Sequence, residues 1–96
     1  MLNTAIIQEK LMPIAENYGL KRVFLFGSYA KGTANEASDV DILIEKGRPL
    51  SLLKLAGMRQ DVEERLQKTV DIVTTTGIDE EFHNAIKGTE ILIYEK

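Results

Sequence analysis

Residues 23 to 45 read VFLFGSYAKGTANEASDVDILIE, and this stretch decides the fold. Two short apolar runs flank a polar segment that begins with Gly27-Ser28 and ends with Asp39-Val40-Asp41. The first run, Arg22–Phe26, is continuous and stops at a glycine, which is typical of a strand buried on both faces. We therefore predict a strand, a turn into a short helix, and a second strand that starts with two aspartates.

The second predicted strand, residues 39–45, places two negative charges close together. Its side chains alternate, so its apolar residues face one side of a sheet while Asp39 and Asp41 face the other. Their Cα atoms would lie roughly 6.6 Å apart, where two carboxylates repel by about 2.5 kcal/mol at an effective dielectric constant near 20. A Mg²⁺ ion between them would reverse the sign of this interaction. A solvated strand start is the alternative interpretation.

The remaining elements complete an α/β (α+β) domain. Apolar spacing and capping residues predict helices over 3–18 and 51–67 and a short helix over 79–87. Short apolar runs predict strands over 69–74 and 91–94. With the helical turn after Gly27, the order is α-β-α-β-α-β-α-β, a small mixed β-sheet flanked by helices.

The helix predicted over residues 51–67 has a repeating apolar face. We expect this face to belong to the core, although a spare apolar face could bind a partner. Its members are Leu52, Leu55, Met58, Val62 and Leu66. Near the N-terminus, Pro13 removes a helical N–H, so we expect a kink or a restart of the first helix there.

Size and composition exclude several classes of protein. The 96 residues, of which 44% are apolar, suffice for one core, so we expect a single domain over 1–96. The net charge of −3 argues against direct nucleic-acid binding. The absence of cysteine and the single histidine, His83, exclude disulfides and zinc sites rich in these residues. No apolar stretch could span a membrane and no signal peptide is visible, so we expect a cytoplasmic protein.

A third aspartate interrupts the strand predicted over residues 69–74. Asp71 points away from its apolar neighbours Val70 and Ile72, and a charge within a strand of a small domain needs a partner. If this strand pairs beside the strand that begins at Asp39, the three carboxylates form one cluster and a metal site. An exposed edge position is the alternative for Asp71.

Gly27-Ser28 marks a turn from strand to helix. Glycine allows close approach of a ligand to the backbone, serine can cap a helix, and a helix N-terminus offers N–H groups to phosphate. An ordinary serine cap is the alternative. The spacing to Gly32-Thr33 superficially resembles a P-loop, but Lys31 precedes the second glycine, so the sequence is not a P-loop.

Together, these features resemble a known family. The stretch LFGSYAKGTANEASDVDILI is similar to the signature of the minimal nucleotidyltransferases, in the DNA polymerase beta-like nucleotidyltransferase superfamily. The resemblance extends from Val23 to Asp71 and includes a leading helix, so it covers nearly the whole chain. It implies the nucleotidyltransferase fold and a Mg²⁺-dependent transfer of a nucleotide.

The resemblance also implies roles for individual residues. Gly27 and Ser28 would hold the triphosphate of ATP, while Asp39 and Asp41 would bind two Mg²⁺ ions. Asp71 would complete the metal ligands and help to deprotonate the acceptor hydroxyl. Lys31 stands where the family more often has arginine; it keeps the positive charge but loses the bidentate fork, which puts its role in phosphate binding in doubt.

Family members of this size resemble antitoxins that act on a HEPN-domain toxin by transferring AMP to a tyrosine. The resemblance therefore implies a protein adenylyltransferase and antitoxin, with a hetero-oligomeric complex as its setting. Two alternatives remain open: a catalytically silent binding subunit that neutralises its partner, and nucleotidyl transfer to a small molecule with the help of a second subunit.

Overall fold

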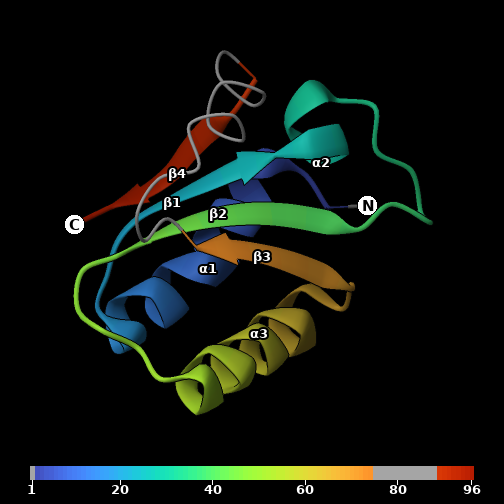
Figure 1. Ribbon diagram of the computed structural model, residues 1–96. Helices are drawn as coiled ribbons and strands as arrows, with labels where there is room; N and C mark the ends of the chain where they lie inside the picture. Colours follow the sequence, from blue (N-terminus) through green and yellow to red (C-terminus); the bar gives the residue numbers. More distant parts are fainter. Residues whose placement is uncertain (1, 75–88) are drawn as a thin grey trace.

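The protein was analysed as a computed structural model that describes residues 2–74 and 89–96 (Figure 1). The order of helices and strands agrees with the prediction over both described ranges, and the helix expected over 79–87 lies outside them. The elements are α1 (Thr4–Tyr18), β1 (Leu20–Phe26), α2 (Gly27–Lys31), β2 (Val40–Lys46), α3 (Leu52–Leu66), β3 (Val70–Thr74) and β4 (Ile91–Glu95).

The strands form one mixed sheet in the order β3-β2-β1-β4. β1 is antiparallel to both of its neighbours, β2 and β4, whereas β2 and β3 are parallel. A parallel pair needs a crossover connection, and α3 supplies it between β2 and β3. The predicted α+β class with a small mixed sheet is confirmed. The crossover makes β3 an edge strand of the described sheet, beside α3.

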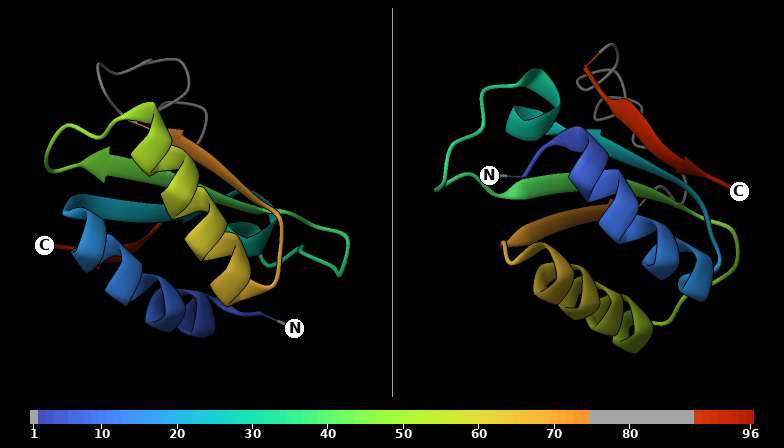
Figure 2. Two further views of the ribbon diagram at one scale, coloured as in Figure 1. Left: turned by 90° about the horizontal axis from the view of Figure 1, so that it is seen from below. Right: turned by 180° about the vertical axis from the view of Figure 1, so that it is seen from behind.

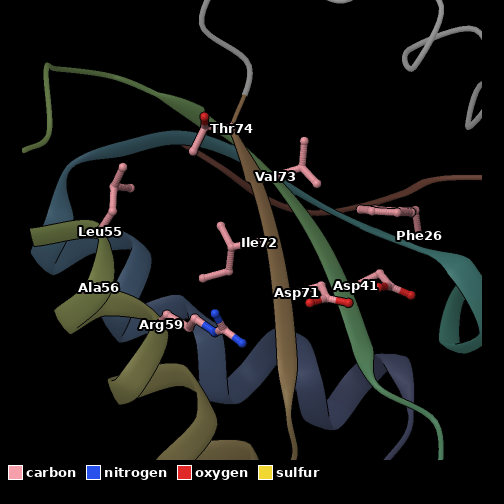
Figure 3. A pocket seen from close by; sticks show the side chains of 9 residues that line it. All are labelled: Phe26, Asp41, Leu55, Ala56, Arg59, Asp71, Ile72, Val73 and Thr74. Carbon is pink, nitrogen blue, oxygen red and sulfur yellow. The ribbon is translucent and has the colours of Figure 1, made fainter. Parts of the chain in front are cut away.

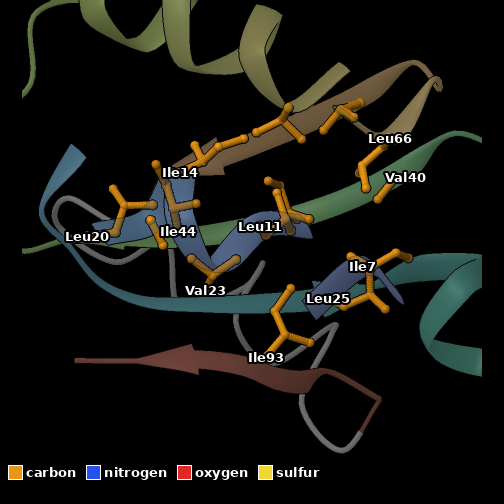
Figure 4. Close-up of a cluster of buried hydrophobic side chains, with 14 of the residues drawn as sticks. Ile7, Leu11, Ile14, Leu20, Val23, Leu25, Val40, Ile44, Leu66 and Ile93 are labelled. Carbon is orange, nitrogen blue, oxygen red and sulfur yellow. The ribbon is translucent and has the colours of Figure 1, made fainter. Parts of the chain in front are cut away.

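Helices α1 and α3 cover one face of the sheet, and the short helix α2 lies at the end of β1 (Figures 1 and 2). The core fills the space between these two helices and the sheet (Figure 4). Its fully buried members are drawn from all of these elements: Ile7, Leu11, Val23, Leu25, Val40, Ile42, Ile44, Met58, Val62, Leu66, Val70 and Ile93. Val40, Ile42 and Ile44, the apolar face predicted for β2, are at most 1% exposed, and Leu43 is also buried on the opposite face, at 3% exposed.

Each of the two long helices starts at a capping side chain, as the sequence predicts. The Asn3 side chain accepts a hydrogen bond of 2.9 Å from the Ile6 N–H, and the Ser51 side chain accepts one of 3.1 Å from the Lys54 N–H. The expected restart at Pro13 is absent, because α1 continues through it as one helix. Side-chain capping therefore fixes the start of each of the two long helices.

The prediction that all five apolar residues of α3 belong to the core is wrong for Leu52. Leu52 is 86% exposed, whereas Met58, Val62 and Leu66 on the same helix are buried. Leu52, Leu55 and Met58 are spaced by three residues, and each such step falls about 60° short of a full helical turn. Two steps back from Met58 therefore turn Leu52 about 120° away from the core-facing side. Leu52 therefore projects into solvent at the first helical residue of α3.

Hydrogen bonds tie helices α1 and α3 together at two points. The Tyr18 hydroxyl donates a hydrogen bond of 2.8 Å to Oδ2 of Asp61, and this bond raises the pKa of Tyr18. At the second point, Arg65 Nε donates to the Lys10 carbonyl at 3.0 Å, and Lys10 Nζ donates to the Arg65 carbonyl at 3.2 Å. The two helices therefore form one layer beneath the sheet. No helix in the described ranges has the length and apolar composition needed to cross a membrane.

We expect Tyr18→Phe to lower the free energy of unfolding by about 1 kcal/mol, because it removes the hydrogen bond to Asp61 while the ring remains. Urea denaturation should show a lower midpoint with an unchanged m-value. In the Tyr18→Phe background, Asp61→Asn should cost nothing further, since its partner is already gone. Two independent, additive losses would contradict this assignment.

Candidate active site

The site is built on a row of residues that crosses three strands. Phe26 of β1 pairs with Asp41 of β2, and Asp41 pairs with Asp71 of β3. Neighbouring strands lie about 4.8 Å apart, so residues in register place their side chains next to each other on one face. Figure 3 shows Asp41 and Asp71 side by side in this row. The strand pairing on which the predicted carboxylate cluster depends is therefore confirmed.

The two aspartates lie on the sheet face opposite α1 and α3. The adjacent residues Val40 and Val70 are fully buried on the helix side, so alternation turns Asp41 and Asp71 to the other side. Asp41 is half-buried, and Asp71 is exposed on the edge strand. The apolar face thus holds the strands in register while the opposite face presents the charges.

Asp41 is the perturbed titratable group of this row. Burial raises its pKa above the ordinary value of 3.8, and the nearby charges of Asp71 and Asp39 and a hydrogen bond with Asp71 raise it further. Each of these effects disfavours the ionised form of Asp41. Without a cation, the surroundings of Asp41 therefore disfavour its negative charge.

Gly27 lies against Asp41. Its φ angle is +70°, which side chains other than glycine rarely adopt, and a Cβ atom there would overlap with Oδ2 of Asp41. The first residue of α2 can therefore approach the carboxylate only because it has no side chain. The structure thus links the predicted Gly27-Ser28 turn directly to Asp41.

Ser28 does not cap α2. The helix starts at Gly27, its N-cap is Phe26, and no side chain makes a capping hydrogen bond. Instead, the Ser28 carbonyl accepts hydrogen bonds from the N–H groups of Gly32 and Thr33. The expectation of a serine cap is wrong because the left-handed Gly27 begins the helix one residue earlier. The Ser28 hydroxyl is thus not used for capping.

A short hydrogen-bonded loop returns the chain to Asp39. The Asn35 side chain accepts a hydrogen bond of 2.8 Å from the Ala37 N–H, and Ser38 Oγ accepts one of 2.9 Å from the Asn35 N–H. The Val40 N–H then donates to the Thr69 carbonyl at 3.0 Å, which starts the pairing with β3. Asp39 is exposed just before β2, near enough to raise the pKa of Asp41.

Arg59 of α3 enters the site from the other side of β3. A pocket of about 530 Å³ is lined by the residues labelled in Figure 3: Phe26, Asp41, Leu55, Ala56, Arg59, Asp71, Ile72, Val73 and Thr74. Arg59 Nε lies 3.8 Å from Glu63 Oε2, and the same oxygen accepts a hydrogen bond of 3.0 Å from the Val70 N–H. Glu63 therefore links the guanidinium group of Arg59 to the residue before Asp71.

The sequence does not single out Arg59. Arg48 and Lys54 are also cations near the same helix, and spacing alone does not distinguish the three. The i,i+4 relation of Arg59 to Glu63 is visible in the sequence, but the position of α3 beside β3 is not. Lys31 is exposed at the last residue of α2 and forms no ion pair with a described residue, so its role stays a prediction.

The donor chemistry of the row fits a divalent cation. Carboxylate oxygens are the ligands that Mg²⁺ prefers, and a cation would relieve the repulsion between Asp41 and Asp71. Within residues 2–74 and 89–96, no three His, Cys, Asp or Glu side chains already form a group that could hold a metal. Two adjacent carboxylates with Asp39 nearby would leave ligand positions for water and phosphate oxygens. The assignment of Asp39, Asp41 and Asp71 as metal ligands stays a prediction.

Gly27→Ala should destabilise the protein more than Gly32→Ala. Both glycines have a left-handed φ angle, so each substitution costs about 1–2 kcal/mol of backbone strain. A Cβ at Gly32 meets nothing within 4 Å, whereas one at Gly27 overlaps with Asp41 and should cost about 1–3 kcal/mol more. Urea denaturation of both variants measures the difference, and equal losses would contradict the close approach.

Asp41→Asn should stabilise the protein at neutral pH without added metal. Because the pKa of Asp41 is raised in the folded state, its contribution to stability is full below about pH 4 and is lost as the pH rises through the folded pKa. The variant has no such loss, so its advantage over the native chain should appear above about pH 4 and grow until Asp41 is ionised. Thermal unfolding from pH 3 to 8 measures this, with the exposed Glu36→Gln as control. An advantage independent of pH would contradict the assignment.

The sequence and the fold both match known proteins. The family model of the nucleotidyltransferase domain matches residues 9–94. A Methanocaldococcus jannaschii protein, MJ0435, provisionally named a protein adenylyltransferase, is 43% identical over 77 residues, which cover 80% of this chain and 83% of that protein. The protein adenylyltransferase MntA of Thermococcus cleftensis is 37% identical over 65 residues, covering 68% and 66% of the two chains.

Solved structures show the same fold at low sequence identity. A chain of a toxin-antitoxin complex with AMP-PNP superposes with a TM-score of 0.80 at 21% identity, covering 93% of this chain and 73% of that chain. A chain from the complex of tri-AMPylated Shewanella oneidensis HEPN toxin with MNT antitoxin gives 0.74 at 17% identity, covering 97% and 73%. The similar architecture, the carboxylate row and the match over residues 9–94 agree, and this chain belongs to the nucleotidyltransferase domain family.

Proposed function

We propose that this protein is a Mg²⁺-dependent protein adenylyltransferase that transfers AMP from ATP to a hydroxyl group, a tyrosine, of a HEPN-domain toxin and so acts as its antitoxin. The observation that carries the proposal is the pairing of Asp41 with Asp71 in register, with Gly27 against Asp41. The relatives named as protein adenylyltransferases support the reaction. The complex of an AMPylated HEPN toxin with its antitoxin supports the acceptor.

Asp39 and Asp41 are the residues that would hold Mg²⁺ beside the phosphates. When bound, the metal neutralises phosphate charge and stabilises the charge that develops during transfer. The turn at Gly27-Ser28 would contact the triphosphate, because the first N–H groups of a helix have no partner within it. Lys31, at the end of the same helix, would offer the phosphates a positive charge without the bidentate fork of the family's usual arginine.

Asp71 would take the proton from the acceptor. The acceptor oxygen attacks the α-phosphorus of ATP, the bond from that phosphorus to the bridging oxygen breaks, and pyrophosphate leaves. The proton of the acceptor hydroxyl passes to a carboxylate oxygen of Asp71. Asp71 is exposed on an edge strand, so an acceptor carried on another protein can reach it. We place this ATP-consuming reaction in the cytoplasm, within a complex of the two proteins.

Asp71→Asn should abolish transfer while leaving ATP binding largely intact, because Asp39 and Asp41 would still hold Mg²⁺ at the phosphates whereas Asp71 acts on the acceptor. The assay is labelling of a HEPN-domain protein, sought in the adjacent reading frame, with ATP that carries label on its α-phosphate. Wild-type protein with Mg²⁺ and ATP should gain ~2.7 kcal/mol of stability at a hundredfold excess over the dissociation constant. Glu36→Gln should behave like the wild type in both measurements.

Labelling by Asp71→Asn at the wild-type rate would contradict the role of Asp71. A wild-type protein that gains no stability from Mg²⁺ and ATP would contradict the nucleotide site. Neutralisation of the partner without any labelling would establish the binding-subunit alternative instead. A labelled small molecule, with the partner unlabelled, would establish the other alternative.

A further inference from the structure

One peptide group at the start of β3 is hydrogen-bonded on both of its sides. Its carbonyl, from Thr69, accepts a hydrogen bond of 3.0 Å from the Val40 N–H of β2. Its N–H, from Val70, donates a hydrogen bond of 3.0 Å to Oε2 of Glu63 on α3. The carbonyl and the N–H of a trans peptide point in opposite directions, so β2 and α3 hold this group from opposite sides. Asp71 is the next residue, and its carboxylate extends from the backbone that these two bonds fix.

The pairing of β3 with β2 carries an unfavourable charge interaction. β3 is an edge strand, and within the described ranges β2 is the one strand that pairs with it. Asp41 and Asp71 are partners in this pairing (Figure 3), and like charges directly opposite each other on neighbouring strands are destabilising. A rotation of β3 about its own axis would turn the two carboxylates apart, but it would also break both bonds of the peptide group before Asp71.

Glu63 is itself held in a defined position. Val62 and Leu66, on the same part of α3, are buried in the core, so this part of the helix is fixed on the sheet. Arg59 Nε, one turn back, lies 3.8 Å from the same Glu63 oxygen that accepts the Val70 N–H. The Glu63 side chain is 33% exposed, so its bond to β3 is partly shielded from water. Glu63 therefore offers β3 an oriented acceptor.

We propose that Glu63 is a positioning residue for Asp71, which it holds beside Asp41 through the Val70 N–H. The proposal rests on the proposed function, in which Asp71 takes the proton of the acceptor hydroxyl, and it adds a residue that acts through Asp71. Glu63 is not among the described residues that line the pocket at Asp71, so it does not touch the reacting atoms there. A carboxylate that takes a proton must lie within hydrogen-bond reach of the acceptor oxygen.

Two substitutions separate the hydrogen bond of Glu63 from its charge. Glu63→Gln keeps the length of the side chain and an acceptor oxygen, but it removes the charge that faces Arg59. Glu63→Asp keeps the charge but is one methylene shorter, so its carboxylate draws back from the Val70 N–H. Glu64→Asp is the matched control, because Glu64 is the next residue of α3, is exposed and undergoes the same chemical change. This control measures the cost of an aspartate within the helix.

Labelling of the HEPN-domain protein, at varied concentrations of that protein, gives KM and kcat for each variant. Glu63→Asp should lower kcat by about ten- to a hundredfold, because a small misplacement of a reacting group is enough for such a loss. Its KM for the acceptor and its stabilisation by Mg²⁺ and ATP should match the wild type. Glu63→Gln should retain most of the wild-type kcat, and Glu64→Asp should retain all of it.

Urea denaturation identifies conditions under which every variant is folded, so that a loss of stability is not mistaken for a loss of transfer. A wild-type kcat for Glu63→Asp, whatever its stability, would show a purely structural role and overturn the proposal. Equal losses of kcat for Glu63→Asp and Glu63→Gln would also overturn it, because the charge rather than the hydrogen bond would then matter.

Amide hydrogen exchange tests the positioning without any transfer. The Val70 N–H should be protected in the wild type and in Glu63→Gln, and it should exchange several-fold faster in Glu63→Asp. If the wild type shows this pattern but transfers no AMP, the proposed function fails while the hold of Glu63 on β3 stands. Equal exchange of the Val70 N–H in all three proteins would overturn the proposal whether or not AMP is transferred.

Discussion

The parallel pairing of β2 with β3 is the constraint on which the site depends. In this register Asp41 lies beside Asp71, thirty positions further along the chain. Like charges on adjacent strands are unfavourable, so this pairing needs support from elsewhere. The support comes from the opposite face of the same strands, where Val40, Ile42, Ile44 and Val70 are buried against α1 and α3. A slip of one residue would bury the aspartates and expose the core residues.

The two faces of these strands therefore serve opposite purposes. The apolar face supplies the stability, and the polar face holds a charged arrangement that lowers it. Burial and neighbouring charges raise the pKa of Asp41, and strongly perturbed carboxylates of this kind cluster at functional sites. Gly27 brings the start of α2 against the same carboxylate, and this close approach joins the two parts of the site.

Helix α3 connects the fold to the site in a second way. As the crossover between β2 and β3, it packs Met58, Val62 and Leu66 into the core. Its neighbouring face carries Arg59 and Glu63, and Glu63 also binds the Val70 N–H at the start of β3. One helix thus packs into the core and holds the start of the edge strand through Glu63.

Several features of this protein could be predicted from residues that are close together in the sequence. The alternation in residues 39–45 indicated which side chains of β2 face the helices, because the side-chain period of a strand is two, although Leu43 on the other face is buried as well. Ser51 indicated where the second long helix starts, and Asn3 or Thr4 where the first does, since capping needs only residues a turn away. Gly27, Asp39 and Asp41 were predicted as site residues from their spacing, and Asp71 because it interrupts an apolar strand, with an ordinary edge position left open as its alternative.

Tertiary structure decided what depends on segments distant in sequence. Only strand pairing placed Asp71 against Asp41, and only the left-handed Gly27 removed Ser28 from the cap position. Packing of α3 on the sheet decided that Arg59 enters the pocket and that Leu52 faces solvent. Periodicity gives the relative angles of residues around a helix, but the rotation of the whole helix on the sheet is fixed by the packing of its core.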